Sequence, residues 1–170
     1  TGKNAVDPTI IQNTNGGRGF PNAINSSGQV VGRFFPSCRC PFITDPNGIG
    51  IRSLGGFRDD FEGDAVSINN IGQVVGWSRI QFRDEQRAFI TGRNGVGMRD
   101  LGVLGGSEAN GSNSVATAIN NLGQVVGSSS LKGSDLHAFI TEPDGGKMRP
   151  IGTLGGVSSH AYDINDSGQV

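Results

Sequence analysis

Short apolar segments alternate with Asn- and Gly-rich turns along the chain. Near the middle, Ala65–Ile68 suits a short β-strand, and Asn69–Gly72 follows it as a hairpin turn. Asn at the first turn position can accept hydrogen bonds from the backbone ahead of it, and Gly at the fourth position supplies a positive φ. The next segment, Gln73–Trp77, is rich in β-branched residues and is predicted to be the second strand.

The same pattern continues through a third and a fourth segment. Arg87–Thr91 is predicted to be a strand, Arg93–Gly97 a Gly-rich turn and Met98–Gly102 a further strand. No segment of useful length has the 3.6-residue period of a helix. Four short antiparallel strands in about 45 residues are typical of one blade of a β-propeller.

Three phrases recur in step along the sequence. The phrase I-N-x-x-G-Q-V has copies that start 44, 51 and 45 residues apart, at Ile24, Ile68, Ile119 and Ile164. Phe-Ile-Thr begins at Phe42, Phe89 and Phe139, and Leu-Gly-Gly begins at Leu54, Leu104 and Leu154. A repeat of this kind cannot bury its own apolar face, so it must stack on its neighbours.

We therefore predict an all-β fold, a β-propeller or propeller segment built from four-stranded antiparallel blades of about 45–50 residues. The expected parts are an outer strand near 9–12, blades near 21–54, 64–103 and 115–153, and the start of a further blade at 160–170, with Tyr162–Ile164 as its inner strand. The residues expected to point inward are Ile24, Ile68, Ile119, the Val-Val pairs, Phe42, Phe89 and Phe139.

Three complete blades are too few for a ring, since propellers have ~4–8 blades. A fourth blade would form if the N-terminal strand joined the C-terminal strands. Alternatively, the chain is part of a longer protein, which is favoured because Val170 falls inside the repeated phrase. Open strand edges recruit other strands, so self-association with a second molecule, in a closed ring or head to tail, is also expected.

The stretch His137-Ala138-Phe139 lies between the phrases I-N-N-x-G-Q-V-V-G and L-G-x-L-G-G. This arrangement resembles the HAF repeat of bacterial extracellular proteins, and the resemblance covers nearly the whole chain. The His of the motif is Arg87 in the second repeat and Cys40 in the first. The resemblance implies a secreted, extracellular or periplasmic, β-rich repeat protein, and it carries no established catalytic residues.

Composition narrows the possible partners. The net charge is −1 and no basic stripe is present, so nucleic-acid binding is disfavoured. No apolar run approaches the ~20 residues of a membrane span. The 29 glycines fall mostly at fixed places in the repeat, which indicates turns rather than low complexity.

Loop lengths point to one face of the predicted propeller. The turns between first and second strands, and between third and fourth, are short and nearly uniform, whereas the other connections vary in length. These two sets lie on opposite faces of a blade. Because recognition usually occurs on variable loops held by a rigid scaffold, we expect a binding surface on the variable-loop face, around the mouth of the central channel.

Several candidate ligand-binding residues belong to these variable loops. They are Asp59, Asp60, Glu62, Asp64, Arg83, His137 and His160. The four carboxylates fall within six residues, and calcium prefers such oxygen ligands. Their spacing matches no EF-hand, and a solvated acidic loop is the favoured interpretation, with calcium as the alternative cofactor. The histidines are candidate acids or bases, although solvent-exposed loop histidines are favoured.

Cys38 and Cys40 are separated by one residue. A disulfide between such close neighbours is strained, and two thiols alone make a poor zinc site. The favoured interpretation is a pair of ordinary loop cysteines, and the alternative is pairing with another segment or chain.

The sequence thus favours a non-catalytic binding or scaffold module with a protein or carbohydrate ligand, and the HAF-repeat resemblance implies that it is extracellular. The alternatives are an accessory subunit of a larger complex, or a hydrolase or lyase that uses Asp and His at the channel mouth. No nucleophile, base or metal motif supports an enzyme.

Overall fold

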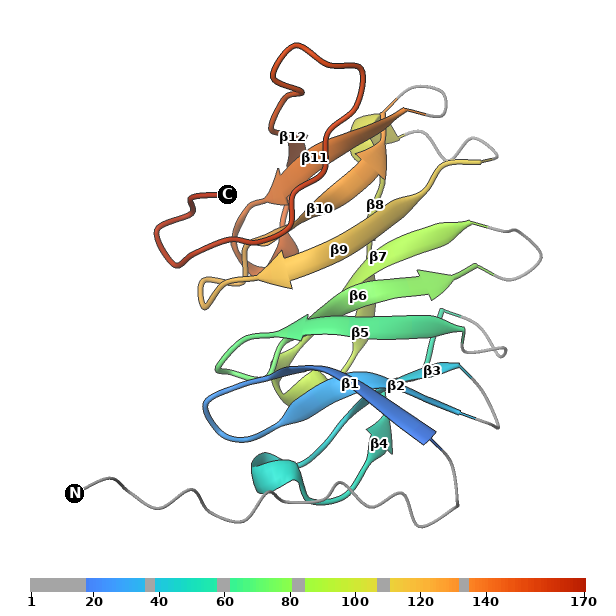
Figure 1. Ribbon diagram of the computed structural model, residues 1–170, viewed down its shortest axis with the longest axis vertical. Helices are drawn as coiled ribbons and strands as arrows, with labels where there is room; N and C mark the ends of the chain where they lie inside the picture. Colours follow the sequence, from blue (N-terminus) through green and yellow to red (C-terminus); the bar gives the residue numbers. More distant parts are fainter. Residues whose placement is uncertain (1–17, 36–38, 58–61, 81–84, 107–110, 132–134) are drawn as a thin grey trace.

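The computed structural model describes residues 18–35, 39–57, 62–80, 85–106, 111–131 and 135–170. Within these ranges the chain forms three four-stranded antiparallel sheets, and its helical elements are single 3-10 turns (Figure 1). The prediction of an all-β fold is confirmed. The outer strand expected near 9–12 lies outside the described residues.

Each sheet is a meander whose strands follow one another in chain order. The first sheet contains β1 (Arg18–Ile24), β2 (Val30–Phe35), β3 (Cys40–Ile43) and β4 (Arg52–Ser53). The second contains β5 (Gly63–Ile68), β6 (Val74–Arg79), β7 (Gln86–Thr91) and β8 (Met98–Gly102). The third contains β9 (Ser114–Ile119), β10 (Val125–Ser130), β11 (Leu136–Thr141) and β12 (Met148–Pro150). The 3-10 turns are η1 (Pro46–Gly48), η2 (Arg93–Gly95), η3 (Leu104–Gly106) and η4 (Pro143–Gly145).

The hairpin turns have the geometry that the sequence predicts. Gly72 adopts a φ of 79°, and its N–H donates to the backbone carbonyl of Asn69 at 3.0 Å. The other three copies of the turn close in the same way, at Gly28, Gly123 and Gly168. This left-handed conformation favours glycine, so the backbone accounts for the repeated Gly.

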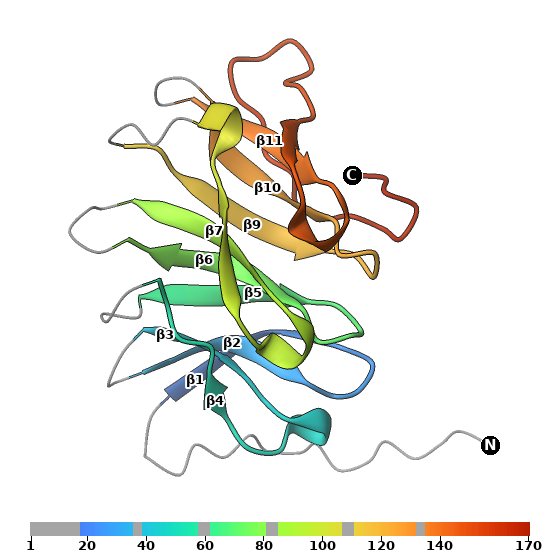
Figure 2. The ribbon, with the colours of Figure 1, turned by 180° about the vertical axis from the view of Figure 1, so that it is seen from behind.

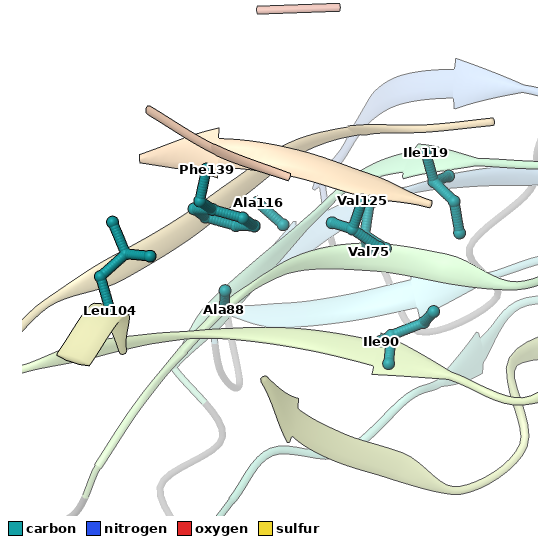
Figure 3. Packing of buried hydrophobic residues seen from close by; sticks show 8 residues of the cluster. All are labelled: Val75, Ala88, Ile90, Leu104, Ala116, Ile119, Val125 and Phe139. Atoms are coloured by element: carbon teal, nitrogen blue, oxygen red, sulfur yellow. The ribbon is translucent and has the colours of Figure 1, made fainter. Parts of the chain in front are cut away.

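The three sheets stack one on another, with the first and third at opposite ends of the molecule (Figures 1 and 2). The first strand of each sheet packs on the preceding sheet: β5 lies against β1, β2 and β3, and β9 against β5, β6 and β7. Side chains from the two facing sheets fill the space between them. The second and third sheets, for example, enclose a core that Figure 3 shows: Val75, Ala88, Ile90, Leu104, Ala116, Ile119, Val125 and Phe139.

The Val-Val pair serves two cores at once. Val74 belongs to the core between the first and second sheets, whereas Val75 belongs to the core between the second and third. Successive side chains of a strand point to opposite faces, so a strand covered on both faces is apolar at consecutive positions. Phe89 likewise faces the first sheet, while Ala88 and Ile90 face the third.

Most of the residues expected to point inward are buried, but Ile24 is not. Its side chain is 66% exposed, compared with 8% for Ile68 and 7% for Ile119. An isoleucine at this position packs on the preceding sheet, and among the described residues no sheet precedes the first. The prediction for Ile24 is therefore wrong.

The expected inner strand Tyr162–Ile164 is not part of a sheet in the described residues. Its neighbour Ala161 donates its backbone N–H to the carbonyl of Gly127 at 3.4 Å, so the segment lies beside the third sheet. The following turn still closes, because Gly168 N–H donates to Asn165 at 3.0 Å. The strand prediction fails because a strand requires a paired neighbour, and here the turn is formed without a continuing ladder.

A glycine in the second strand of each sheet allows the first strand to approach closely. The pairing of β5 with β6 shifts register between Ala65 and Ser67, which marks a β-bulge. At Gly76, opposite this bulge, an added Cβ would lie 1.9 Å from the carbonyl oxygen of Asp64. The glycine that ends the phrase Q-V-V-G is therefore required by this contact, and Gly32 and Gly127 stand in the same situation.

A serine hydroxyl joins the second sheet to the third. The backbone N–H of Ala88 donates to Ser114 Oγ at 2.9 Å, and that hydroxyl donates to the carbonyl of Gly102 at 2.6 Å. Ser159 makes the same pair of bonds beside the third sheet, with Ala138 and Gly152.

The first sheet lacks this arrangement. Pro41 stands at the position of Ala88 and has no N–H to donate, and Gly63 stands at the position of Ser114. The junction between the first and second sheets thus lacks the serine acceptor, and Pro41 at this junction has no N–H that would require one.

Candidate functional site

The two ends of the stacked sheets differ in character. One end, which we call the turn face, carries the I-N-x-x-G turns and the turns η1, η2 and η4 (Figure 1). The opposite end, the loop face, carries the connections between second and third strands and between sheets. Of the predicted site residues, Asp59, Asp60 and Arg83 lie outside the described residues.

A ladder of asparagine side chains runs across the turn face. Each side-chain amide donates to the backbone carbonyl of the equivalent residue in the next repeat at 3.1 Å, from Asn25 to Asn69, from Asn69 to Asn120 and from Asn120 to Asn165. The side-chain oxygen of the same residue accepts from its own turn; Asn69 Oδ1, for example, accepts from Gln73 N–H at 2.9 Å. The second role is the one predicted from the sequence, whereas the bond to the next repeat was not predicted.

A second row of hydrogen bonds lies beside the first. It runs from the N–H of Ser26 to Asn70 Oδ1, from the N–H of Asn70 to Asn121 Oδ1 and from the N–H of Asn121 to Asp166 Oδ1. Asp166 also accepts from the Asn121 side-chain amide at 2.9 Å. The side-chain bond first, and the backbone bond second, lower the pKa of the Asp166 carboxyl. These polar groups are therefore engaged in holding the repeats together.

On the loop face, Asp64 joins the first sheet to the second. Its side chain is buried, and Oδ1 accepts from Asn22 Nδ2 at 2.7 Å while Oδ2 pairs with Arg33. The Arg33 guanidinium also lies over the ring of Phe20, 5.4 Å from the centroid. Both carboxylate oxygens of Asp64 are thus occupied by side chains of the first sheet.

Glu62 is the centre of a neighbouring group that we call the arginine cluster: Arg39, Glu62, Trp77 and Arg79. Arg39 and Arg79 pair with the two oxygens of Glu62 at 3.3 and 3.2 Å. The guanidinium of Arg39 lies over the Trp77 ring at 5.7 Å from its centroid. The two described carboxylates of the acidic segment, Glu62 and Asp64, therefore already have cationic partners.

These pairs bear on the calcium alternative. In the described part of the chain, no three His, Cys, Asp or Glu side chains converge to hold a metal ion. A calcium site in this segment would have to draw on Asp59 and Asp60, which are not described.

The two histidines lie apart from these carboxylates. His137 is half-buried in β11 opposite Ser129, and His160 is exposed with its ring 6.5 Å from that of Tyr162. Within the described residues, no hydrogen bond or ion pair joins either histidine to a carboxylate.

Cys40 is not an ordinary loop residue. It lies in β3, is 1% exposed and is part of a disulfide. The other cysteine of the chain, Cys38, is outside the described residues. The prediction of ordinary loop cysteines is therefore wrong for Cys40, because the repeat places this position at the start of a buried strand.

The loop face also contains a hollow on the side of the third sheet that faces away from the second sheet, with Gln86 of the second sheet also contributing to it. Its volume is about 370 Å³, and its lining is Gln86, Gly111, Asn113, Ser114, Val115, Ser128, Ser130 and Leu136. No charged side chain contributes to this lining within the described residues. Sequence reasoning missed the hollow, although the run of three serines from Ser128 to Ser130 gave a signal of unusually small residues after V-V-G.

Much of the polar lining is already engaged. Asn113 accepts from Gln86 N–H at 2.8 Å and donates to the Gly111 carbonyl at 3.1 Å, and Ser130 Oγ accepts from Asn113 N–H at 3.1 Å. In contrast, the Ser128 hydroxyl and the Gln86 side-chain amide make no hydrogen bond in the described structure. These two groups are available to a ligand.

A buried ion pair lies next to the hollow. The Nη2 atom of Arg87 and the Oε2 atom of Glu85 are 3.7 Å apart, and the two residues are only 3% and 4% exposed. Glu85 Oε1 also accepts from the N–H of Gly111, a lining residue, at 2.7 Å. The pair therefore fixes one edge of the hollow.

Comparisons of the chain with family models, with curated proteins and with solved structures returned no match. No helix in the described part of the chain has the length and apolar character required to cross a membrane.

Proposed function

We propose that this chain is a β-propeller segment of a secreted, non-catalytic binding module that recognises its ligand on the loop face. The contrast between the two faces is the observation that carries the proposal. On the turn face, identical residues in each repeat bind one another through the asparagine ladder. On the loop face, the same repeat positions differ in size and charge, and a hollow is present.

The propeller arrangement is supported by the way the sheets pack. Each sheet is a four-stranded meander, and its first strand lies on the preceding sheet. Propeller blades have this strand order and pack face to face around an axis. A crystal structure with sheets fanned around a common axis is expected, and sheets stacked along a straight axis would contradict the proposal.

Secretion is supported by the disulfide at Cys40, since structural disulfides persist in oxidising compartments. It agrees with what the HAF-repeat resemblance implies. Expression with and without an export signal tests this point: correctly oxidised, soluble protein is expected only from the exported form.

The binding role can be tested by comparing the two faces. Ligands would be selected for the wild-type protein from a peptide-display library and from a glycan array, which represent protein and carbohydrate partners. The loop-face variant Gln86→Ala/Leu136→Ala is expected to lose binding. The turn-face variant Ile71→Ala/Leu122→Ala, which also removes exposed side chains, is expected to keep it. Loss of binding in the turn-face variant alone would contradict the proposal.

The exposed ends of the stack favour a second role as a subunit that assembles with itself. Leu154 is 108% exposed, whereas its repeat equivalent Leu104 is 2% exposed and packs between two sheets. At the other end Ile24 is exposed where Ile68 is buried. Ala161 and Ile164 already pack on the third sheet at the place where Ile24 of a second copy would pack, so a second copy would cover only what they leave exposed, which includes Leu154.

Sedimentation and light scattering of the 170-residue chain test this second role. Concentration-dependent, head-to-tail association is expected, and Leu154→Ser is expected to weaken it because it removes the apolar contact. A monomer at all concentrations would exclude it.

A further inference from the structure

The hollow on the loop face occupies a position that the chain fills with its own side chains one repeat earlier. Counted from the isoleucine of the repeated phrase, Ser128 is equivalent to Trp77, Ser130 to Arg79 and Asn113 to Glu62. Counted from the phenylalanine of Phe-Ile-Thr, Gln86 is equivalent to Arg39. The equivalents of four lining residues are thus the four members of the arginine cluster.

This equivalence explains the hollow physically. At the loop end of the second sheet, the large side chains of the arginine cluster contact one another and occupy the space there. At the loop end of the third sheet the backbone repeats, but serine and amide side chains replace the indole and guanidinium groups. The scaffold is the same, and the missing side-chain volume remains as a hollow of about 370 Å³.

We propose that this hollow receives a tyrosine or tryptophan side chain from a partner protein. The inference rests on the proposed binding role of the loop face and identifies its ligand class. The Trp77 indole, at the equivalent position of the preceding repeat, is the internal template for the group that fits.

The arginine cluster contains an indole ring and guanidinium groups, and the chemistry of the lining distinguishes between these two kinds of group. A guanidinium needs an anion, and no charged side chain contributes to the lining among the described residues. The carboxylate of Glu85, which accepts from the N–H of the lining residue Gly111, is buried with Arg87. A cation would lose its hydration there without a partner, so an arginine of the partner is disfavoured.

An aromatic group suits both parts of the lining. Val115 and Leu136 offer apolar contacts to a ring, while Ser128 and Gln86 retain free hydrogen-bonding groups. Tyrosine and tryptophan combine a large apolar ring with one polar group, and they are frequent anchors in interface pockets. A pyranose ring is disfavoured because the described lining has no aromatic side chain on which a sugar would stack.

The test uses titrations of ¹⁵N-labelled protein with three small probes: N-acetyl-tryptophanamide, N-acetyl-argininamide and methyl glucopyranoside. The tryptophan probe is expected to shift the Gln86 side-chain and Ser128 backbone signals, with the other two probes giving no saturable shift. The variant Ser128→Trp restores the residue of the preceding repeat and is expected to fill the hollow, so that the Kd of the tryptophan probe rises at least about tenfold. The variant Leu122→Trp adds the same ring to the exposed turn face and is the matched control, with binding unchanged.

Three results would overturn the inference: no saturable shift with the tryptophan probe, equal binding by Ser128→Trp, or preferential shifts with the arginine or sugar probe. The last of these would leave the proposed binding role of the loop face intact. Should Ser128→Trp fail to fold, Leu136→Ala provides the second test, since it widens the hollow and removes a ring contact; weaker binding of the tryptophan probe is expected, and unchanged binding would overturn the inference.

Discussion

The side-chain amide of Asn69 donates to the backbone carbonyl of Asn120 at 3.1 Å, across the junction between two repeats. The same side chain closes its own turn, because its Oδ1 accepts from Gln73 N–H at 2.9 Å. Asn69 is only 3% exposed, so water cannot replace either bond without opening the turn. One buried residue thus determines a local turn and the placement of the next sheet.

The substitution Asn69→Ala is expected to lower the free energy of unfolding by about 2–3 kcal/mol, because it leaves buried backbone groups without partners. Urea denaturation followed by circular dichroism measures the change. The control is Asn70→Ala, an exposed neighbour whose bond from the Ser26 N–H water can replace, so its loss is expected to cost only about 0.5 kcal/mol. Equal effects of the two substitutions would contradict the structural role of Asn69.

The substitution Gly76→Ala is expected to destabilise the protein by at least about 3 kcal/mol. The added methyl group would lie 1.9 Å from Asp64 O, and a backbone carbonyl in a sheet cannot move away without breaking the pairing. Gly19→Ala is the matched control, since no atom lies within 4 Å of a Cβ built there. Its thermal midpoint is expected to equal that of the wild type; a similar drop in both variants would show that the close contact is not the cause.

The buried pair Glu85–Arg87 gives a prediction about charge. Arg87→Met is expected to cost about 3–5 kcal/mol, because it leaves Glu85 as a buried carboxylate without this cation. Glu85→Gln, which keeps an acceptor for Gly111 N–H, is expected to be destabilising for the reciprocal reason. The double variant is expected to recover much of the loss. Denaturation of all four proteins forms a double-mutant cycle, and strictly additive effects would exclude coupling.

The lowered pKa of Asp166 predicts a pH dependence at the turn face. A carboxyl whose pKa is lower in the folded than in the unfolded state contributes stability above the unfolded value, ~3.9 for aspartate. That contribution is lost as the pH falls through the lower folded pKa. A ¹³C NMR titration is expected to place the Asp166 midpoint below that of an ordinary aspartate, and Asn121→Ala to raise it. No movement in the variant would contradict the assigned hydrogen bonds.

The sequence predicts the strands well because each strand is bounded by turn residues that require one particular backbone conformation. Gly72, with its φ of 79°, and the alternation in Val74 and Val75 are local signals. Its errors concern neighbours rather than local conformation. Ile24 is exposed and Tyr162–Ile164 is unpaired because burial and pairing depend on which sheet lies alongside, and the repeat pattern does not specify this at the ends of the stack.

The candidate site could be predicted only in part, for a related reason. The choice of the loop face follows from loop lengths, and Glu62 and Asp64 do lie there. Their arginine partners are far away in the sequence, however, so the neutralisation of the two carboxylates appears only in three dimensions. The hollow at Ser128 arises from a difference between equivalent positions of the repeats. It can be recognised only when the repeats are compared with one another.

The serine bond between Ala88 and Ser114 has a consequence for exchanging repeats by recombination or design. If the second repeat were duplicated in tandem, Gly63 of the second copy would stand beside Ala88 of the first copy. The fully buried N–H of Ala88 would then have no hydroxyl to accept its hydrogen bond. An exchange that placed a serine at the position of Gly63 would put its hydroxyl beside Pro41, which has no backbone N–H to donate to it. The unit that can be shuffled is therefore the segment from the third strand of one sheet to the first strand of the next, because that segment carries donor and acceptor together.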